Sequence, residues 1–154
     1  MVDLTRINPF NMVDIAEKKA VPRTAEAIGR IALMKGTIKA IREGKVEKGD
    51  PFAAAEIACI QAVKRTSDLI PMCHDMPIDA VNANFDVCDH YVEARCRVSA
   101  TYKTGVEMEA LTGVSVALLT IWDMVKYLEK DEDGQYPSTT ISDIRVIEKR
   151  KGQS

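Results

Sequence analysis

Two stretches of alternating apolar and polar residues constrain the fold more than any other feature of this 154-residue chain. They cover residues 78–88 and 91–102, and only Asp89 and His90 separate them. Successive side chains of a β-strand point to opposite faces, so this alternation is typical of a half-buried strand. The short connection predicts that the two strands pair as an antiparallel hairpin.

Two longer segments have the spacing of helices. Residues 107–130 carry apolar side chains along one broad stripe and predict the longest helix of the chain. Asp50 followed by Pro51 is a typical helix start, because the Asp side chain can cap the first turn and proline suits the first helical position. We therefore expect a second helix over residues 52–69, ended by Pro71.

The remaining elements complete a known order. Residues 37–43 predict a short helix that Gly44 ends, and residues 23–34 and 140–149 predict strands. The order β-α-α-β-β-α-β indicates an α+β, ferredoxin-like split βαβ fold, with helices on one face of a four-stranded antiparallel sheet. The hairpin alternation suggests that the open face is partly apolar, which predicts an oligomer.

Length and composition fit one globular domain. We expect an irregular segment over residues 1–22, a domain over 23–150 and a tail over 151–154. The 21 Lys and Arg against 23 Asp and Glu give a net charge of −2, which does not indicate a nucleic-acid partner. No stretch reaches the roughly 20 apolar residues of a membrane span, and no basic start precedes an apolar segment. A cytoplasmic protein without a membrane partner is expected.

The four cysteines, Cys59, Cys73, Cys88 and Cys96, form no C-x-x-C pair. A disulfide framework is not favoured in a chain of this length without an export signal. A zinc site could use Cys73 and Cys88 with nearby histidines, but adjacent Cys and His side chains in a strand point to opposite faces. We expect small buried apolar residues and no metal site.

Polar residues that the fold does not need gather in four places. Each has a structural explanation as well, since charges near helix ends complement the helix dipole and acid–lysine pairs form surface ion pairs. The four places are Lys48-Gly49-Asp50, Lys64-Arg65-Thr66, Cys73-His74, and the long helix with Glu107, Glu109, Asp123 and Lys126.

The long helix also constrains the assembly of any site. Asp123 and Lys126 lie in an apolar segment, so we expect them to be half-buried with perturbed pKa values. Glu109 and Asp123 are 14 positions apart, which places them on one helical face but about 21 Å apart along the axis. Either they contact different ends of a large ligand or a second subunit completes the site, and we favour the second subunit.

Six blocks of the sequence closely resemble the molybdenum cofactor biosynthesis protein C (MoaC) family. The likeness runs from about Leu4 to Lys149, with the blocks in the family's order. The blocks are Met12-Val13-Asp14, Lys48-Gly49-Asp50, Lys64-Arg65-Thr66, residues 69–74 (LIPMCH), residues 104–112 (TGVEMEALT) and residues 119–126 (LTIWDMVK).

The resemblance implies a lyase of molybdopterin biosynthesis, cyclic pyranopterin monophosphate synthase. Its substrate is a cyclised dihydroguanosine triphosphate, made from GTP by a radical-SAM partner, and its products are cyclic pyranopterin monophosphate and pyrophosphate. The resemblance also implies a homohexamer, a trimer of dimers, with each active site at a dimer interface. No cofactor is implied by the sequence, although Mg²⁺ with the triphosphate is an open alternative.

Residue by residue, the resemblance implies catalytic roles for Asp123, Lys126, Lys48 and His74. The matching substrate-binding positions are Met72, Cys73, His74, Met108, Glu109, Lys64, Glu107, Arg23 and Asp14. We expect Lys48, Lys64 and Arg23 to hold the triphosphate and stabilise the departing pyrophosphate. We expect Asp123 and Lys126 to carry the proton transfers of ring opening and closure, with His74 as a further donor. The chain departs from the family at Asp75, where the family usually has Pro, and in its tail, so no tail contact is carried over.

Two other functions remain open from the residues alone. A regulatory module that binds a phosphate ligand would need Lys48 and Lys64, but it has no use for Asp123 and Lys126. A structural assembly protein would use the charged pairs as interface salt bridges. Loss of turnover in Asp123→Asn would distinguish the lyase from the regulatory module. Saturable, salt-sensitive binding of GTP analogues would contradict the structural protein.

Overall fold

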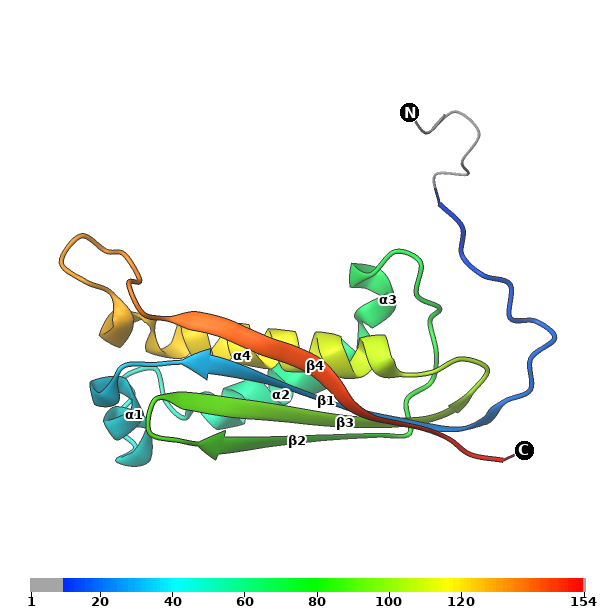
Figure 1. The fold of residues 1–154 in the computed structure, drawn as a ribbon, viewed down its shortest axis with the longest axis horizontal. Coiled ribbons are helices and arrows are strands. Elements are labelled where there is room, and N and C mark those ends of the chain that lie inside the picture. Colours follow the sequence, from blue (N-terminus) through cyan, green and yellow to red (C-terminus); the bar gives the residue numbers. More distant parts are fainter. Residues whose placement is uncertain (1–9, 154) are drawn as a thin grey trace.

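The computed structural model describes residues 10–153 and contains one four-stranded sheet with helices on one side (Figure 1). The elements in chain order are β1 (Val21–Ala32), α1 (Lys35–Arg42), α2 (Pro51–Lys64), α3 (Thr66–Leu69), β2 (Ala80–Val87), β3 (Tyr91–Tyr102), α4 (Glu107–Glu129) and β4 (Thr140–Lys151). The strand order is β2-β3-β1-β4 and every neighbouring pair is antiparallel. The predicted ferredoxin-like α+β fold is confirmed.

Strands β2 and β3 form the predicted antiparallel hairpin. Val81 lies opposite Val98 and Phe85 opposite Ala94, so the apolar residues of both strands share one face. The Cys88 N–H donates to Tyr91 O at 2.9 Å and closes the turn. Strand β1 then adds to the other edge of β3, with Ala27 opposite Cys96.

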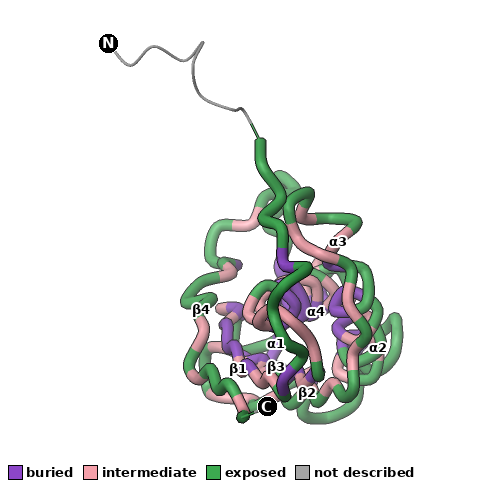
Figure 2. Tube along the Cα trace, turned by 90° about the vertical axis from the view of Figure 1, so that its right-hand side faces the viewer, coloured by how far each residue is buried: buried purple, intermediate pink, exposed green. Residues whose placement is uncertain are grey.

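The core lies between this face of the sheet and the two long helices. Figure 2 shows the buried residues concentrated where α2 and α4 cover β1 and β3. By length and composition α4 could cross a membrane, but its apolar stripe is part of this core. Fully buried members of the stripe are Val106, Ala110, Val114, Leu118, Ile121 and Val125.

The opposite face of the sheet is charged, which corrects the expectation of a partly apolar surface. Arg95 donates to Glu26 at 2.9 Å and to Glu93 at 3.4 Å, and Arg30 donates to Glu93 at 3.2 Å. The Arg30 guanidinium also lies 4.4 Å from the centre of the Tyr91 ring. The apolar positions of the alternation all face the helices, so this surface gives no hydrophobic reason for an oligomer.

The start of α2 follows the sequence prediction, but its end does not. Asp50 Oδ1 accepts the N–H groups of Phe52 at 2.9 Å and Ala53 at 3.3 Å, so it is the predicted cap. The expected single helix over 52–69 is wrong, because the chain breaks at Arg65. The Thr66 hydroxyl donates to the carbonyls of Ala62 and Val63, and such bonds compete with helix continuation.

A buried carboxylate holds α1 in place. Glu129, near the end of α4, is 1% exposed and accepts the Met34 N–H at 3.1 Å and the Thr139 hydroxyl at 2.7 Å. It also accepts the Thr37 hydroxyl. Met34 is the N-cap residue of α1 and has no side-chain cap of its own, so Glu129 supplies the acceptor for the Met34 N–H that the third helical residue supplies in a capping box.

The predicted division at residues 22/23 and 150/151 stays a prediction. Strand β1 begins at Val21 and β4 ends at Lys151, so both strands extend slightly past those boundaries. Residues 1–9 of the expected irregular segment lie outside the described part of the chain.

Candidate active site

A carboxylate held by two lysines lies on the last turns of α4. Lys126 Nζ is 3.1 Å from Asp123 Oδ1, and Lys48 Nζ is 3.3 Å from Asp123 Oδ2. Lys48 Nζ also donates to the backbone oxygen of Asp123 at 3.1 Å. Each carboxylate oxygen therefore has its own ammonium group, and the structure brings together three of the four predicted catalytic residues.

The two lysines also keep this carboxylate ionised. The Lys126 ammonium, followed by that of Lys48, holds the pKa of the Asp123 carboxyl below its usual value. The expected half-burial of Asp123 is wrong, because its side chain is 59% exposed. The pKa is perturbed as predicted, but the cause is charge and hydrogen bonding rather than burial.

Lys48 reaches α4 from a tight turn between α1 and α2. The Gly49 N–H donates to Val46 O at 3.1 Å, so residues 46–49 form a β-turn with Lys48 near its tip. Gly49 has a φ of 114°, a backbone conformation that residues other than glycine rarely adopt. This turn allows Lys48 to face α4 while Asp50 caps α2.

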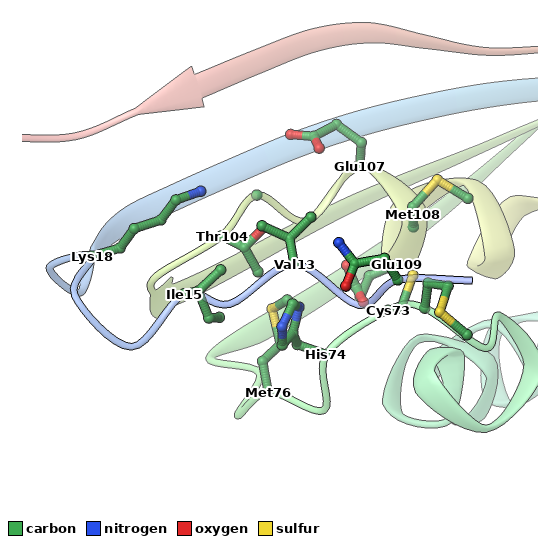
Figure 3. A pocket seen from close by; sticks show the side chains of 13 residues that line it. Val13, Ile15, Lys18, Cys73, His74, Met76, Thr104, Glu107, Met108 and Glu109 are labelled. Carbon is green, nitrogen blue, oxygen red and sulfur yellow. The ribbon is translucent and has the colours of Figure 1, made fainter. Parts of the chain in front are cut away.

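A second group of predicted residues lines a cavity of about 300 Å³ at the other end of α4 (Figure 3). The loop after α3 and the first turn of α4 supply most of the wall, and the N-terminal segment covers it. Six predicted residues line it: Met72, Cys73, His74, Glu107, Met108 and Glu109. In Figure 3, Cys73, His74 and Glu109 lie close together on one side.

Glu109 is the buried acid of this cavity. Its residue is 3% exposed, and burial raises the pKa of its carboxyl. Its own backbone N–H offsets part of that effect, while the charge of Glu107 adds to it. Burial, with a contribution from Glu109, also raises the pKa of the Cys73 thiol. Glu109 is therefore more readily protonated than an ordinary glutamate, and Cys73 is not an activated nucleophile.

The remaining predicted residues surround the cavity in different ways. Glu107 pairs with Lys149 of β4 at 3.2 Å, and Lys64 lines a narrow recess beside His74 and Glu109. Asp14 is exposed and accepts the N–H of Ala16 at 2.9 Å, so its carboxylate stabilises its own turn.

Arg23 lies in a neighbouring basic hollow of about 440 Å³, which Lys18, Lys19 and Lys151 also line. Its Nη2 donates to Lys103 O at 3.4 Å, and its buried Nε has no hydrogen-bond partner within residues 10–153. Four cationic side chains around one hollow suit a polyanion such as a phosphate chain.

Comparison with known proteins assigns the chain to a family. The sequence model of the MoaC family matches residues 12–152. The chain belongs to the MoaC family. The chain is 58% identical to the "Probable cyclic pyranopterin monophosphate synthase" of Thermococcus kodakarensis over 99% of both proteins. It is 62% identical to the protein of that name from Pyrococcus furiosus, over 91% of this chain and 90% of the relative.

A third relative has a different name. The Methanothermobacter thermautotrophicus protein, "Probable cyclic pyranopterin monophosphate synthase accessory protein", is 59% identical over 91% of this chain and 88% of its own length. All three relatives match nearly their whole length, so the family resemblance noted from the six blocks is confirmed.

Within one MoaC chain the two groups of residues stay apart. Both Glu109 and Asp123 lie on the single helix α4, so the rise of about 1.5 Å per residue separates them by about 21 Å. Figure 1 shows the loop that follows α3 beside the start of α4, and α1 beside its end. One small substrate cannot contact both groups of the same chain.

Sequence reasoning missed several residues around the cavity. Lys18 and Thr104 line it, and Lys149 pairs with Glu107. Thr104 stood within the TGVEMEALT block and could have been chosen from it. Lys18 lies in a segment without regular spacing, and Lys149 meets Glu107 only through the pairing of β4, so neither gave a signal.

Proposed function

We propose that this MoaC protein is a cyclic pyranopterin monophosphate synthase. The reaction rearranges a cyclised dihydroguanosine triphosphate to cyclic pyranopterin monophosphate and releases pyrophosphate, an early step of molybdopterin biosynthesis. The names of the relatives support this activity. The structural observation that carries it is the ionised Asp123 between the ammonium groups of Lys48 and Lys126.

The three residues of this group suit proton transfer. Asp123 is a carboxylate and can accept a proton, and the ammonium group beside each of its oxygens can donate one. When the cyclic phosphate closes, a substrate hydroxyl oxygen bonds to the α-phosphorus, the bond to pyrophosphate breaks, and the hydroxyl proton must leave. A carboxylate base with one ammonium group within 3.3 Å of each of its oxygens can accept that proton and return one.

The cavity and the basic hollow suit the rest of the substrate. We assign the ring system to the cavity of His74 and Glu109, where the raised pKa of Glu109 makes this residue a better proton donor than an ordinary, fully ionised glutamate. We assign the phosphates to Arg23 and Lys64, whose positive charges would stabilise the departing pyrophosphate.

A complete site then needs two copies of the chain. The separation along α4 supports a site in which one subunit supplies Asp123 and its lysines and the partner supplies the cavity. We propose a homohexamer, a trimer of dimers, as the MoaC resemblance implies. A radical-SAM cyclase that makes the substrate from GTP would act before it, and both would work in the cytoplasm.

Mg²⁺ would bind as a companion of the triphosphate. Within residues 10–153, no three side chains of His, Cys, Asp or Glu are grouped so as to hold a metal. Mg²⁺ usually keeps several waters and binds through substrate phosphates, which fits a chain that offers cationic side chains for the remaining phosphate charge.

The test is to supply purified protein with the cyclised dihydroguanosine triphosphate and to follow pyrophosphate and pterin together. Both products should appear in equal amounts, and Asp123→Asn should slow their formation by about 10²–10⁴-fold while leaving the fold intact. Tight binding by the wild type without either product would contradict the lyase and favour a regulatory binding module. A wild-type rate for Asp123→Asn would contradict the assigned role of Asp123.

A further inference from the structure

A tyrosine of α4 binds the turn that presents Lys48. The Tyr127 hydroxyl accepts the backbone N–H of Glu47 at 2.7 Å. Glu47 and Lys48 are the two central residues of the β-turn closed between Val46 and Gly49. In such a turn the N–H of the first central residue has no partner within the turn, so Tyr127 satisfies a group that the turn leaves free.

Tyr127 is also placed to connect this turn with Asp123. Residues four apart on a helix stand on the same face, and Tyr127 follows Asp123 by four positions. One face of α4 therefore contacts the turn at two points, at the Tyr127 hydroxyl and where Lys48 meets Asp123. Buried Val46 and the Asp50 cap fix the two ends of the turn, and the contacts with Tyr127 and Asp123 hold the residues between them.

The exposure of Tyr127 argues against a role in packing alone. Its residue is 38% exposed, whereas the core side chains of α4 are buried completely. Lysine has a long flexible side chain, so its ammonium stays near one carboxylate oxygen only if the backbone beneath it is fixed. The hydroxyl of Tyr127 fixes the residue directly before Lys48.

We propose that Tyr127 is a positioning residue that holds Lys48 against Asp123. The expected effect of Tyr127 on the reaction rate rests on the proposed function, because Lys48 and Asp123 are the groups assigned to proton transfer. The effect of Tyr127 on the contact between Lys48 and Asp123 is independent of that function and can be measured without turnover.

The kinetic test is a double-mutant cycle of Tyr127→Phe and Lys48→Ala. Tyr127→Phe keeps the ring and removes only the hydroxyl, and we expect kcat to fall about 10-fold with little change in KM, because displaced catalytic groups chiefly affect the chemical step. In the Lys48→Ala background the same change should have less than about a twofold effect, since the group that it positions is gone. Tyr136→Phe, whose ring packs edge-on against Trp122 at 5.3 Å, is the matched control and should keep the wild-type rate.

A second measurement does not depend on activity. Lys48 is one of the two groups that hold the pKa of Asp123 low, so releasing Lys48 should raise that pKa toward its usual value. NMR titration of the Asp123 carboxyl carbon should give a higher pKa in both Tyr127→Phe and Lys48→Ala than in the wild type. Tyr136→Phe should leave this pKa unchanged. If the wild type shows no turnover but the pKa of Asp123 rises in both variants, the positioning role is supported and the proposed function is contradicted.

Two results would overturn the proposal. One is an unchanged titration of Asp123 in Tyr127→Phe. The other is a loss of kcat in Tyr127→Phe that persists in full in the Lys48→Ala background, because Tyr127 would then act on something other than Lys48.

Discussion

At the scale of single residues, the candidate site uses two different ways to perturb a carboxyl group. Asp123 is exposed and its pKa is lowered by two lysines, whereas Glu109 is buried and its pKa is raised. Two acids whose environments push their pKa values apart are typical of enzymes that need both a base and an acid near neutral pH.

Glu109→Gln should separate stability from activity. Ionising Glu109 costs more free energy in the folded protein than in the unfolded chain, because its pKa is raised from about 4.5 by folding. The stability of the wild type should therefore fall relative to the variant as the pH rises from about 4.5 through the raised folded pKa. Urea unfolding from pH 4 to 8 should therefore show a difference that grows with pH in favour of Glu109→Gln. Turnover should fall about 100-fold or more. Parallel stability curves would contradict the raised pKa.

The chemistry of these residues could be predicted only in part from the sequence. The family resemblance named Asp123, Lys126 and Lys48, and the structure places their side chains together, but Lys48 and Asp123 are separated by 75 positions, and no spacing rule connects them. The exposure of Asp123 was misjudged because apolar neighbours in a helix sequence do not show which face of the helix is covered.

At the scale of elements, local signals predicted boundaries well wherever the stabilising contact is local. Asp50 and Pro51 marked the start of α2, and Gly44 lies just past α1 with a φ of 65°. The start of α1 at Lys35 depends on Glu129, 95 positions beyond Met34. A cap supplied from so far along the chain leaves no pattern in the sequence near α1.

Removing the Glu129 carboxylate should destabilise the end of the molecule that carries α1. Glu129→Ala leaves three donors without their acceptor in the interior, and we expect a loss of about 2–4 kcal/mol in the free energy of unfolding. Glu129→Gln keeps one oxygen acceptor and should cost less. Urea denaturation measures both, with the exposed Glu132→Ala as a control expected to lie within about 0.5 kcal/mol of wild type. A loss of that small size for Glu129→Ala would contradict the capping role.

Gly113 marks a close approach of α4 to side chains of α2 and β3. A Cβ there would lie 2.9 Å from Cys96 Sγ and 3.0 Å from Cys59 Sγ, two thiols that are themselves 3.4 Å apart. Although alanine favours helix by about 1 kcal/mol over glycine, Gly113→Ala should lower the free energy of unfolding by about 1–3 kcal/mol. Thermal unfolding checks the change. Adding Cys96→Ala should recover part of the loss, and no recovery would mean that the strain lies elsewhere.

At the scale of the whole molecule, the hairpin pattern predicted the sheet but not the character of its open face. Alternation shows that a strand has two different faces. Alternation does not show which polar groups a neighbouring strand adds to the open face of the sheet. Here β1 places Glu26 and Arg30 beside Arg95 and Glu93 of β3, so opposite charges alternate across the strands. The argument for an oligomer therefore rests on the length of α4 and not on an exposed apolar sheet.

That argument can be tested with two inactive variants. Asp123→Asn damages the group at the end of α4 and Glu109→Gln damages the cavity at its start, so each should be inactive alone. If each site combines the two ends of α4 from different subunits, a mixed dimer contains one site with both defects and one site with neither.

Random pairing of co-expressed chains makes half of the dimers mixed, and half of the sites in a mixed dimer are intact. The preparation should therefore recover about one quarter of wild-type turnover. Co-expressed Asp123→Asn and Lys126→Ala, which damage the same end of α4, are the control that should recover nothing. Turnover that stays at the sum of the two variants would show that the ends of α4 do not complete one site across subunits.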